Sequence, residues 1–294
     1  MKPAISLIIF TVFSGFGFGL LFWLNLHIQT LTNFPTIINF LLGFLLSFVG
    51  LVSSTFHLGN PQRALLAFTQ WRSSWLSREA ILALFALVTS FINAIIIIFF
   101  KLYFYWLGLL ASGLCLLTIF ATAMIYTQMK TVPRWNMKVT PALFLLYATV
   151  GSSIILKNEV LSFALFILLG IVQILTWKLG DQKFKTISNI NSATGLSNTN
   201  KLVRLLEPPH TGSNYLLKEM VHIVAQKHIY KLRLIAISLL SLVPAFFCLV
   251  ILMADNNNSL FLIFMAMTNV IGTLVSRWLF FSEAEHVVGL YYDR

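Results

Sequence analysis

The sequence predicts an all-α integral membrane protein with eight transmembrane helices. Of its 294 residues, 58% are hydrophobic and only 10% are charged, whereas a soluble domain carries roughly 25% charged residues. Most of its apolar runs are close to the ~20 residues that a helix needs to cross ~30 Å of hydrocarbon. The alternation of polar and apolar residues that is typical of transmembrane β-barrels is absent, so helices are the spanning structure that remains.

The first apolar run, residues 4–24, predicts a retained helix rather than a signal peptide. Only Lys2 precedes it, and no polar region with a small-residue cleavage site follows it. The other predicted spans are 36–56, 79–100, 102–126, 141–156, 160–177, 234–254 and 260–281. Little more than Lys101 separates the third span from the fourth, and the fifth and sixth are divided only around Lys157.

Composition divides the chain into three parts. Residues 1–177 are expected to form a six-helix membrane block, 178–233 a cytoplasmic loop with an amphipathic helix, and 234–294 the last two transmembrane helices with a cytoplasmic tail. Pro208 and Pro209 prevent a helix in the first half of the middle part. From Tyr215 to Arg233, apolar residues recur at helical spacing between lysines. Attachment to the membrane surface and docking of a soluble partner both remain open for this basic helix.

The distribution of positive charge predicts the orientation. If the N-terminus is cytoplasmic, 18 of the 20 Lys and Arg residues lie on the cytoplasmic side, and only Lys101 and Lys157 lie opposite. An even number of spans then places both termini in the cytoplasm. Topology alone accounts for this asymmetry, and we expect membrane lipid, but not nucleic acid, among the partners.

The residue pattern argues against several kinds of chemistry. All Asp, Glu, Lys and Arg residues are expected at or beyond helix ends, whereas a transporter usually needs ionisable groups near the bilayer midplane. No histidines are expected to face one another inside helices, as a haem would require, and Cys115 and Cys248 are isolated in apolar segments. We therefore predict no metal site and no redox cofactor bound by this chain.

The connection between the second and third spans carries the candidate site. Gly59 and Pro61 are expected to end the second helix directly after His57. Ser77 is a candidate N-cap for the third helix, which would place Glu79 in its first turn. His57 and Glu79 would then lie at the same depth, at the cytoplasmic end of adjacent helices.

This pair suits the chemistry of a quinone, which takes up two protons with two electrons. An imidazole can hydrogen-bond a quinone oxygen, a carboxylate can exchange protons with it, and Arg78 could stabilise negative charge on the ring. The competing interpretation is structural: His57 caps helix carbonyls, and Arg78 or Arg72 neutralises Glu79. The residues alone leave both interpretations open.

Four segments resemble a known family: HLGNPQRALLAFTQWRSSWLSRE (57–79), IYTQMKTVPRWN (125–136), KEMVHIVAQKHIYKLRLIA (218–236) and RWLFFSEAEHVVGLYY (277–292). They resemble the membrane anchor subunits of dimethyl sulfoxide reductase-type molybdenum oxidoreductases, over essentially the whole chain. The resemblance implies a molybdopterin catalytic subunit and a four-cluster iron-sulfur subunit as partners. It also implies quinone as an exchangeable substrate at His57 and Glu79, and location in the bacterial cytoplasmic (inner) membrane.

Within the family, SSTFHLGNPQRA, QWRSSWLSRE and SEAEHVVGLYY look most like the anchors of quinone-linked sulfite dehydrogenases. An anchor that oxidises quinol for a dimethyl sulfoxide reductase is the alternative, and a membrane transporter is the alternative from another class. Cytoplasmic cations can steer and orient an acidic partner. The residues expected to dock the iron-sulfur subunit are Arg63, Arg72, Arg134, Lys218, Lys227 and Lys231.

Overall fold

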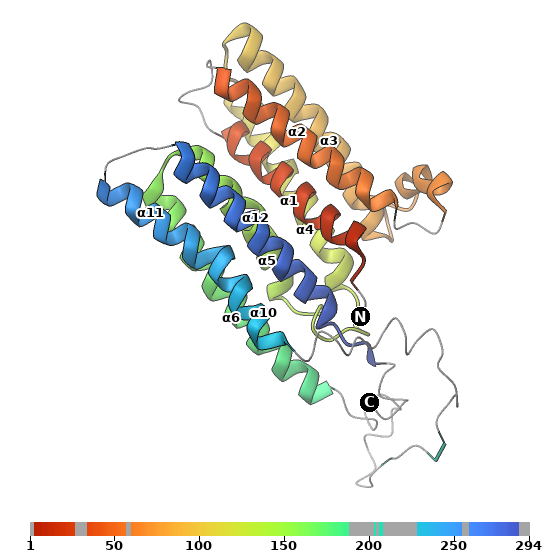
Figure 1. Ribbon diagram of the computed structural model, residues 1–294. Helices are drawn as coiled ribbons and strands as arrows, with labels where there is room; N and C mark the ends of the chain where they lie inside the picture. The colour runs from red at the N-terminus through yellow and green to blue at the C-terminus, as the bar shows by residue number, and fades with distance from the viewer. Residues whose placement is uncertain are drawn as a thin grey trace.

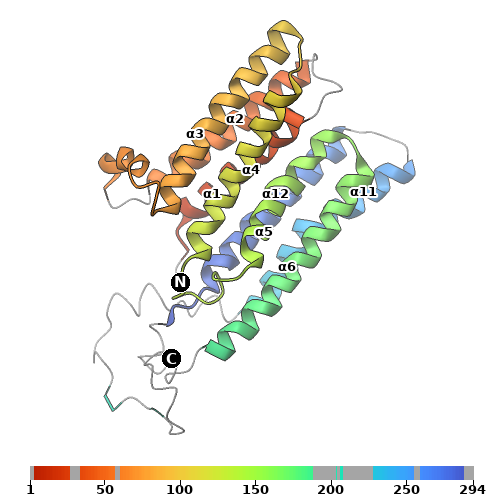
Figure 2. The same cartoon turned by 180° about the vertical axis from the view of Figure 1, so that it is seen from behind.

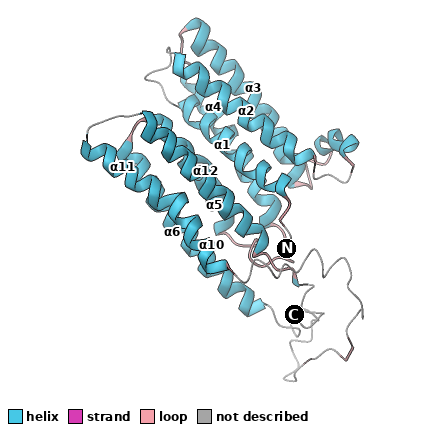
Figure 3. Cartoon of the chain, viewed as in Figure 1, coloured by secondary structure: helices cyan, strands magenta, loops and turns pink. Residues whose placement is uncertain are grey.

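The computed structural model describes residues 3–26, 34–56, 60–187, 203, 206–207, 228–254 and 259–287. Its secondary structure within these ranges is helical (Figure 3). Eight helices there are long and apolar enough to cross a membrane, which confirms the predicted fold class and number of spans. The predicted helix around Lys218 and Lys227 lies outside the described residues, apart from its last turn.

Three of the spans contain 3₁₀ or π segments. In order, the elements are α1 (Ile5–Leu26), α2 (Phe34–Thr55), η1 (Pro61–Phe68), α3 (Trp75–Ile95) with η2 (Ile96–Phe100), α4 (Tyr105–Thr127), α5 (Val139–Ser152) with η3 (Ser153–Leu156), α6 (Glu159–Ile187), α10 (Ile229–Ile237) with η4 (Ser238–Leu242) and α11 (Val243–Ala254), and α12 (Ser259–Ser282). Three predicted boundaries were wrong by four residues or more. Helix α3 begins four residues earlier than expected, α6 continues ten residues past its predicted end to Ile187, and the seventh span begins at Ile229, so that Arg233 lies in a helix.

The spans form two groups that lie side by side. Helices α1 to α4 make one group, and α5, α6, α10 to α11 and α12 make the other (Figures 1 and 2). Helix α1 is central, because it packs against α2, α4 and α5 and also touches α12. One apolar core lies around α1, and a second lies among α5, α6, α11 and α12.

The start of α1 and the end of α12 lie at the same end of the bundle (Figure 1). This end also carries the α2–α3 and α4–α5 connections, with Arg72, Lys130 and Lys138, and is called the basic end below. Lys101 and Lys157 lie at the opposite end, where each ends a span in the left-handed conformation, with φ of 53° and 51°. The predicted separation of positive charge thus corresponds to the two ends of the described bundle.

Small residues bring the backbones of α1 and α2 into direct contact. A Cβ added at Gly17 would meet the backbone nitrogen of Ser47, and one at Gly50 would meet the backbone of Ser14. Without a hydrophobic driving force between helices in lipid, such close approach supplies packing energy. Gly43 belongs to the same contact, because a Cβ added there would meet the Leu21 side chain at 3.0 Å and the Gly17 carbonyl oxygen at 3.5 Å.

We expect Gly17→Ala to destabilise the protein, because its new Cβ would force α1 and α2 apart, at a cost of about 1 to 3 kcal/mol. Gly113→Ala in α4 is the matched control, since no described atom lies within 4 Å of a Cβ at that position. The control should keep or raise stability, because Ala is the better helix former by about 1 kcal/mol. The measurement is the thermal midpoint of each variant in detergent, and equal midpoints for the two variants would contradict the packing account.

Candidate functional site

Glu79 lies deeper in the bundle than the sequence indicated. Its helix is capped by Ser74 rather than by the predicted Ser77, so Glu79 falls in the second turn of α3. Its side chain points into the protein, is only 3% exposed, and accepts a hydrogen bond from the hydroxyl of Thr122 in α4. No ion pair to Glu79 occurs among the described residues. The carboxyl group is therefore a buried polar group held by a single neutral donor.

Arg78 and Arg72 do not neutralise this carboxylate, so that part of the structural interpretation was wrong. Arg78 donates from Nε to the carbonyl of Trp71 at 2.9 Å and from Nη2 to that of Arg72 at 2.7 Å. Its guanidinium also lies 4.4 Å from the ring centroid of Trp75. Arg78 thus fixes the turn that precedes α3, and Arg72 remains exposed on that turn.

The other predicted site residues are placed only in part. His57, Lys218 and Lys227 lie outside the described residues, and the described helix η1 contains Arg63 without a described side chain. Lys231 is exposed on α10 at the basic end. The structure therefore brings none of the predicted partners to Glu79 within its described ranges, and the pairing of His57 with Glu79 stays a prediction.

Arg277 is the interior charge that sequence reasoning missed. It lies in α12, five residues before the helix ends, and is 1% exposed. Its guanidinium carbon is 3.5 Å from the ring centroid of Phe144 and 4.5 Å from that of Tyr147. Its Nε and Nη1 groups have no hydrogen-bond partner in the described part of the chain. The expectation that every cation lies at or beyond a helix end was therefore wrong. The position of this arginine inside the last predicted apolar run could have indicated that it is buried.

A narrow cavity of about 10 Å³ lies between α1, α4, α5 and α12. Arg277 and Tyr147 border it from one side, and Thr122, which binds Glu79, borders it from α4. The remaining polar wall comes from Thr11, Ser14 and Thr273. The buried carboxylate and the buried guanidinium are thus both linked to one polar interior space.

A second polar cluster continues from Tyr147 into the other half of the bundle. The Tyr147 hydroxyl is hydrogen-bonded to Gln173 of α6 and to Ser276 of α12. Ser276 also donates to Gln173, over 3.2 Å. These three side chains border a cavity of about 30 Å³, which Arg134 and Glu283 border at the basic end.

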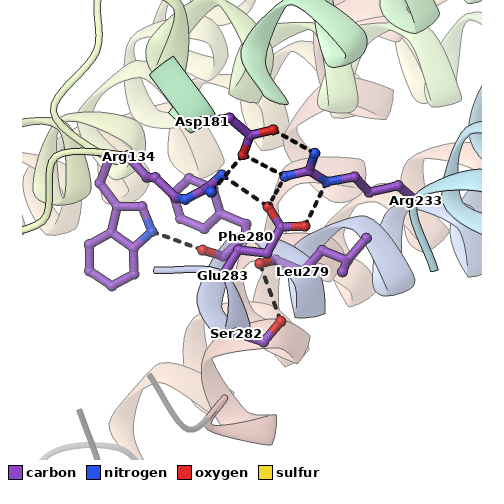
Figure 4. Close-up of polar contacts among 8 residues, drawn as sticks. Arg134, Asp181, Arg233, Leu279, Phe280, Ser282 and Glu283 are labelled. Atoms are coloured by element: carbon purple, nitrogen blue, oxygen red, sulfur yellow. Dashed lines mark hydrogen bonds and ion pairs between the residues drawn. The ribbon is translucent and has the colours of Figure 1, made fainter. Parts of the chain in front are cut away.

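Four charged side chains close the basic end, as Figure 4 shows. Arg134 pairs with Asp181 at 2.6 Å and with Glu283 at 3.1 Å. Arg233 pairs with the same two carboxylates, at 2.8 Å and 2.6 Å. This charged cluster joins the α4–α5 connection, α6, α10 and α12. Arg134, predicted as a docking residue, is therefore engaged inside the chain.

These features define a multi-pass membrane protein with a polar interior, and the described residues contain no group of three or more His, Cys, Asp and Glu that could hold a metal ion. The chain belongs to the family described as "DMSO reductase anchor subunit (DmsC)", which matches residues 1–282. It is therefore a membrane anchor subunit of a dimethyl sulfoxide reductase-type complex, and the subunits that it anchors are its partners.

A curated relative supports this assignment along the full length. One of the subunits of a sulfite dehydrogenase from Allochromatium vinosum is 27% identical over 332 residues, an alignment that covers 100% of this chain and 99% of the relative. No solved structure matches the chain. The predicted family resemblance is confirmed, including its similarity to a sulfite dehydrogenase.

We expect Glu283→Gln to destabilise the protein far more than Asp181→Asn. The Glu283 side chain is 4% exposed and binds both arginines, so its loss leaves buried positive charge unpaired, at a cost of about 3 kcal/mol or more. The Asp181 side chain is 38% exposed, and water can replace much of its contribution, about 1 kcal/mol. Thermal midpoints of the two variants provide the comparison; the reverse order would show that Asp181 holds the charged cluster together.

Proposed function

We propose that this chain is the quinone-interacting anchor subunit of a molybdopterin and iron-sulfur oxidoreductase that oxidises sulfite. The buried Glu79 carboxyl group carries the proposal. It lies near the basic end of an anchor subunit, in a membrane span, without a cation to neutralise it among the described residues. An ionisable group inside a membrane span is costly and is functional by default.

Electrons come from outside this chain in the proposed function. The described residues offer no metal-ligating cluster, and Cys115 and Cys248 are single buried thiols. A four-cluster iron-sulfur subunit therefore delivers electrons, and a molybdopterin subunit oxidises the substrate. The chain contributes the quinone pocket, in which His57 binds a quinone oxygen and Glu79 exchanges protons with it. Arg78 acts through the turn that it fixes, next to α3.

The choice of substrate rests on the relative and on topology. The name of the Allochromatium vinosum relative supports sulfite as the electron donor, whereas the description of the family supports a reductase that oxidises quinol. Cations gathered at one end of the bundle support the cytoplasmic placement of that end and of both termini in the bacterial inner membrane. An anchor whose docking end faces the cytoplasm suits sulfite oxidation there. Membership of an anchor family removes the transporter alternative.

The docking surface of the proposal lies at the basic end. Arg72 and Lys231 are exposed there, on the α2–α3 connection and on α10. Arg63, Lys218 and Lys227 complete the predicted surface, and Arg134 contributes by holding the charged cluster beneath it. Positive charge at this end can orient an acidic iron-sulfur subunit and keep its last cluster close to the quinone.

Glu79→Gln should leave the complex intact and membrane-bound, with normal sulfite oxidation when a soluble dye accepts the electrons. Turnover with quinone should fall by ~10²-fold to 10⁴-fold if Glu79 is an obligatory proton-exchanging group. His57→Ala should have the same signature. Glu159→Gln, which changes a carboxylate in the first turn of α6 at the opposite end, is the control. Normal quinone turnover in Glu79→Gln and His57→Ala would disprove the proposed site.

Charge reversal tests the docking surface. Arg72→Glu combined with Lys231→Glu should release the iron-sulfur and molybdopterin subunits from membranes at physiological salt, because both cations are exposed at the proposed interface. Lys101→Glu combined with Lys157→Glu makes the same change in charge at the opposite end and should leave them bound. The measurement is the distribution of the partner subunits between membrane pellet and supernatant. Retention in both variants would mean that these cations serve topology alone.

A further inference from the structure

Two cavities with several polar side chains in their largely apolar walls share one bordering residue, Tyr147. The first holds about 10 Å³ and is bordered by Thr122, Arg277 and Tyr147. The second holds about 30 Å³ and is bordered by Tyr147, Ser276 and Glu283. A cavity needs roughly 10 to 15 Å³ for one water molecule, so there is room for one water in the first and about two in the second.

The hydrogen-bonding groups that line the first cavity favour water as its occupant. Arg277 presents Nε and Nη1, two N–H groups that no described residue binds, so the occupant must accept hydrogen bonds. The hydroxyls of Thr11, Ser14 and Thr273 all donate to carbonyls of their own helices, which leaves their oxygen lone pairs as acceptors. The occupant must therefore also donate. Water does both, whereas a halide or a deprotonated oxyanion only accepts.

Side chains connect these spaces to Glu79 and to the basic end. Thr122 borders the first cavity and donates to Glu79. Tyr147 borders both cavities, and its hydroxyl lies within hydrogen-bond distance of Ser276 and of the Gln173 amide oxygen. Because each hydroxyl carries one proton, one of the two donates to Gln173 and the other donates to its neighbouring hydroxyl. The second cavity ends beside the charged cluster, of which Asp181 is 38% exposed. A series of hydrogen-bonding groups thus leads from Glu79 to the basic end, interrupted only by the two cavities.

We propose that water in the two cavities, together with Thr122, Tyr147 and Ser276, forms an internal proton path between Glu79 and the basic end. The inference rests on the proposed role of Glu79 at the quinone. It adds a route by which the buried carboxyl group recovers its proton, since at 3% exposure the group itself has little contact with solvent. Tyr147 is a positioning residue of this path, because it acts on the quinone only through other groups.

Electrons and protons are conserved in the proposed transfers. The quinone takes two electrons from the iron-sulfur subunit and two protons, which Glu79 and the path deliver one after the other, and leaves as quinol. After Glu79 gives a proton to a quinone oxygen, its carboxylate draws one from Thr122. Each group along the path then passes one proton on and receives one from the next, with water at the basic end as the source. The positive charge of Arg277 disfavours an excess proton at rest in the first cavity. Transfer is therefore driven by the carboxylate, while the guanidinium holds the water in place.

Tyr147→Phe is the decisive variant, because it removes only the hydroxyl between the cavities and leaves the Glu79 and Thr122 pair untouched. In the membrane-bound complex, quinone turnover should fall at least about tenfold, within the range for proton-transfer groups, and its rate ratio in H₂O over D₂O should rise. Sulfite oxidation with a soluble dye should stay unchanged, and the complex should remain assembled in the membrane. Thr122→Val should slow quinone turnover in the same way, and Thr122→Ser, which keeps the hydroxyl, should restore it.

Two matched controls remove a hydroxyl elsewhere. Thr118→Val changes the residue one turn before Thr122, whose hydroxyl donates to Leu114, and Tyr103→Phe changes a tyrosine bonded to Asn25 away from both cavities. Both should leave quinone turnover unchanged. If Tyr147→Phe fails to assemble, Ser276→Ala interrupts the same step and should give the same loss.

The outcomes separate this inference from the proposed function. If Glu79→Gln abolishes quinone turnover while Tyr147→Phe and Ser276→Ala change neither the rate nor the isotope ratio, the path is wrong and the quinone site stands. If Glu79→Gln itself leaves quinone turnover normal, the proposed site fails, and the path, which ends at Glu79, fails with it. Loss of dye-linked activity together with quinone turnover in Tyr147→Phe would show a structural role for Tyr147 and would also overturn the path.

Discussion

The burial of charge in a membrane span is the constraint on which the rest of the structure depends. Moving an ion out of water costs several kcal/mol even after relaxation, so buried ions persist only when they are paired or otherwise stabilised. The charged cluster meets this requirement, since each of its arginines binds the same two carboxylates. Because the four side chains come from four segments, their pairing fixes how α6, α10 and α12 meet at the basic end.

Glu79 and Arg277 meet the same constraint only in part. Within the described ranges, a single hydroxyl binds Glu79, and aromatic rings cover the guanidinium of Arg277 while two of its N–H groups lack partners. A desolvated cation–π contact contributes about 2 kcal/mol or more, against a desolvation cost of several kcal/mol for the ion. A chain that pairs four other charges at the same end leaves these two incompletely satisfied. Function is expected at such sites, because the free energy spent on burying these two groups is not offset by ion pairs that stabilise the fold within the described part of the chain.

The spans were predictable because hydropathy depends on local composition. The eight apolar runs correspond to the eight membrane-length helices of the described residues, and Lys101 and Lys157 each lie in a short connection, as expected. Helix boundaries were less accurate, since the choice between Ser74 and Ser77 as the N-cap depends on how the preceding turn packs. That turn is held by Arg78 across two carbonyls. This error of about one turn separates the expected interfacial position of Glu79 from its observed buried one.

The candidate site was predictable in its chemistry but not in its depth or its neighbours. Glu79 was identified from residue type and family resemblance, but no sequence pattern indicates that Thr122, 43 residues away, is its hydrogen-bond donor. Arg134 carries the same charge as Arg72, yet the fold pairs it with Asp181 and Glu283 from two distant helices. Positive charge in a loop thus has two uses that the sequence cannot separate. A cation that pairs with carboxylates of the same chain, as Arg134 does, holds the helices together. A cation without such a carboxylate among the described residues, such as exposed Arg72, can attract an acidic partner subunit.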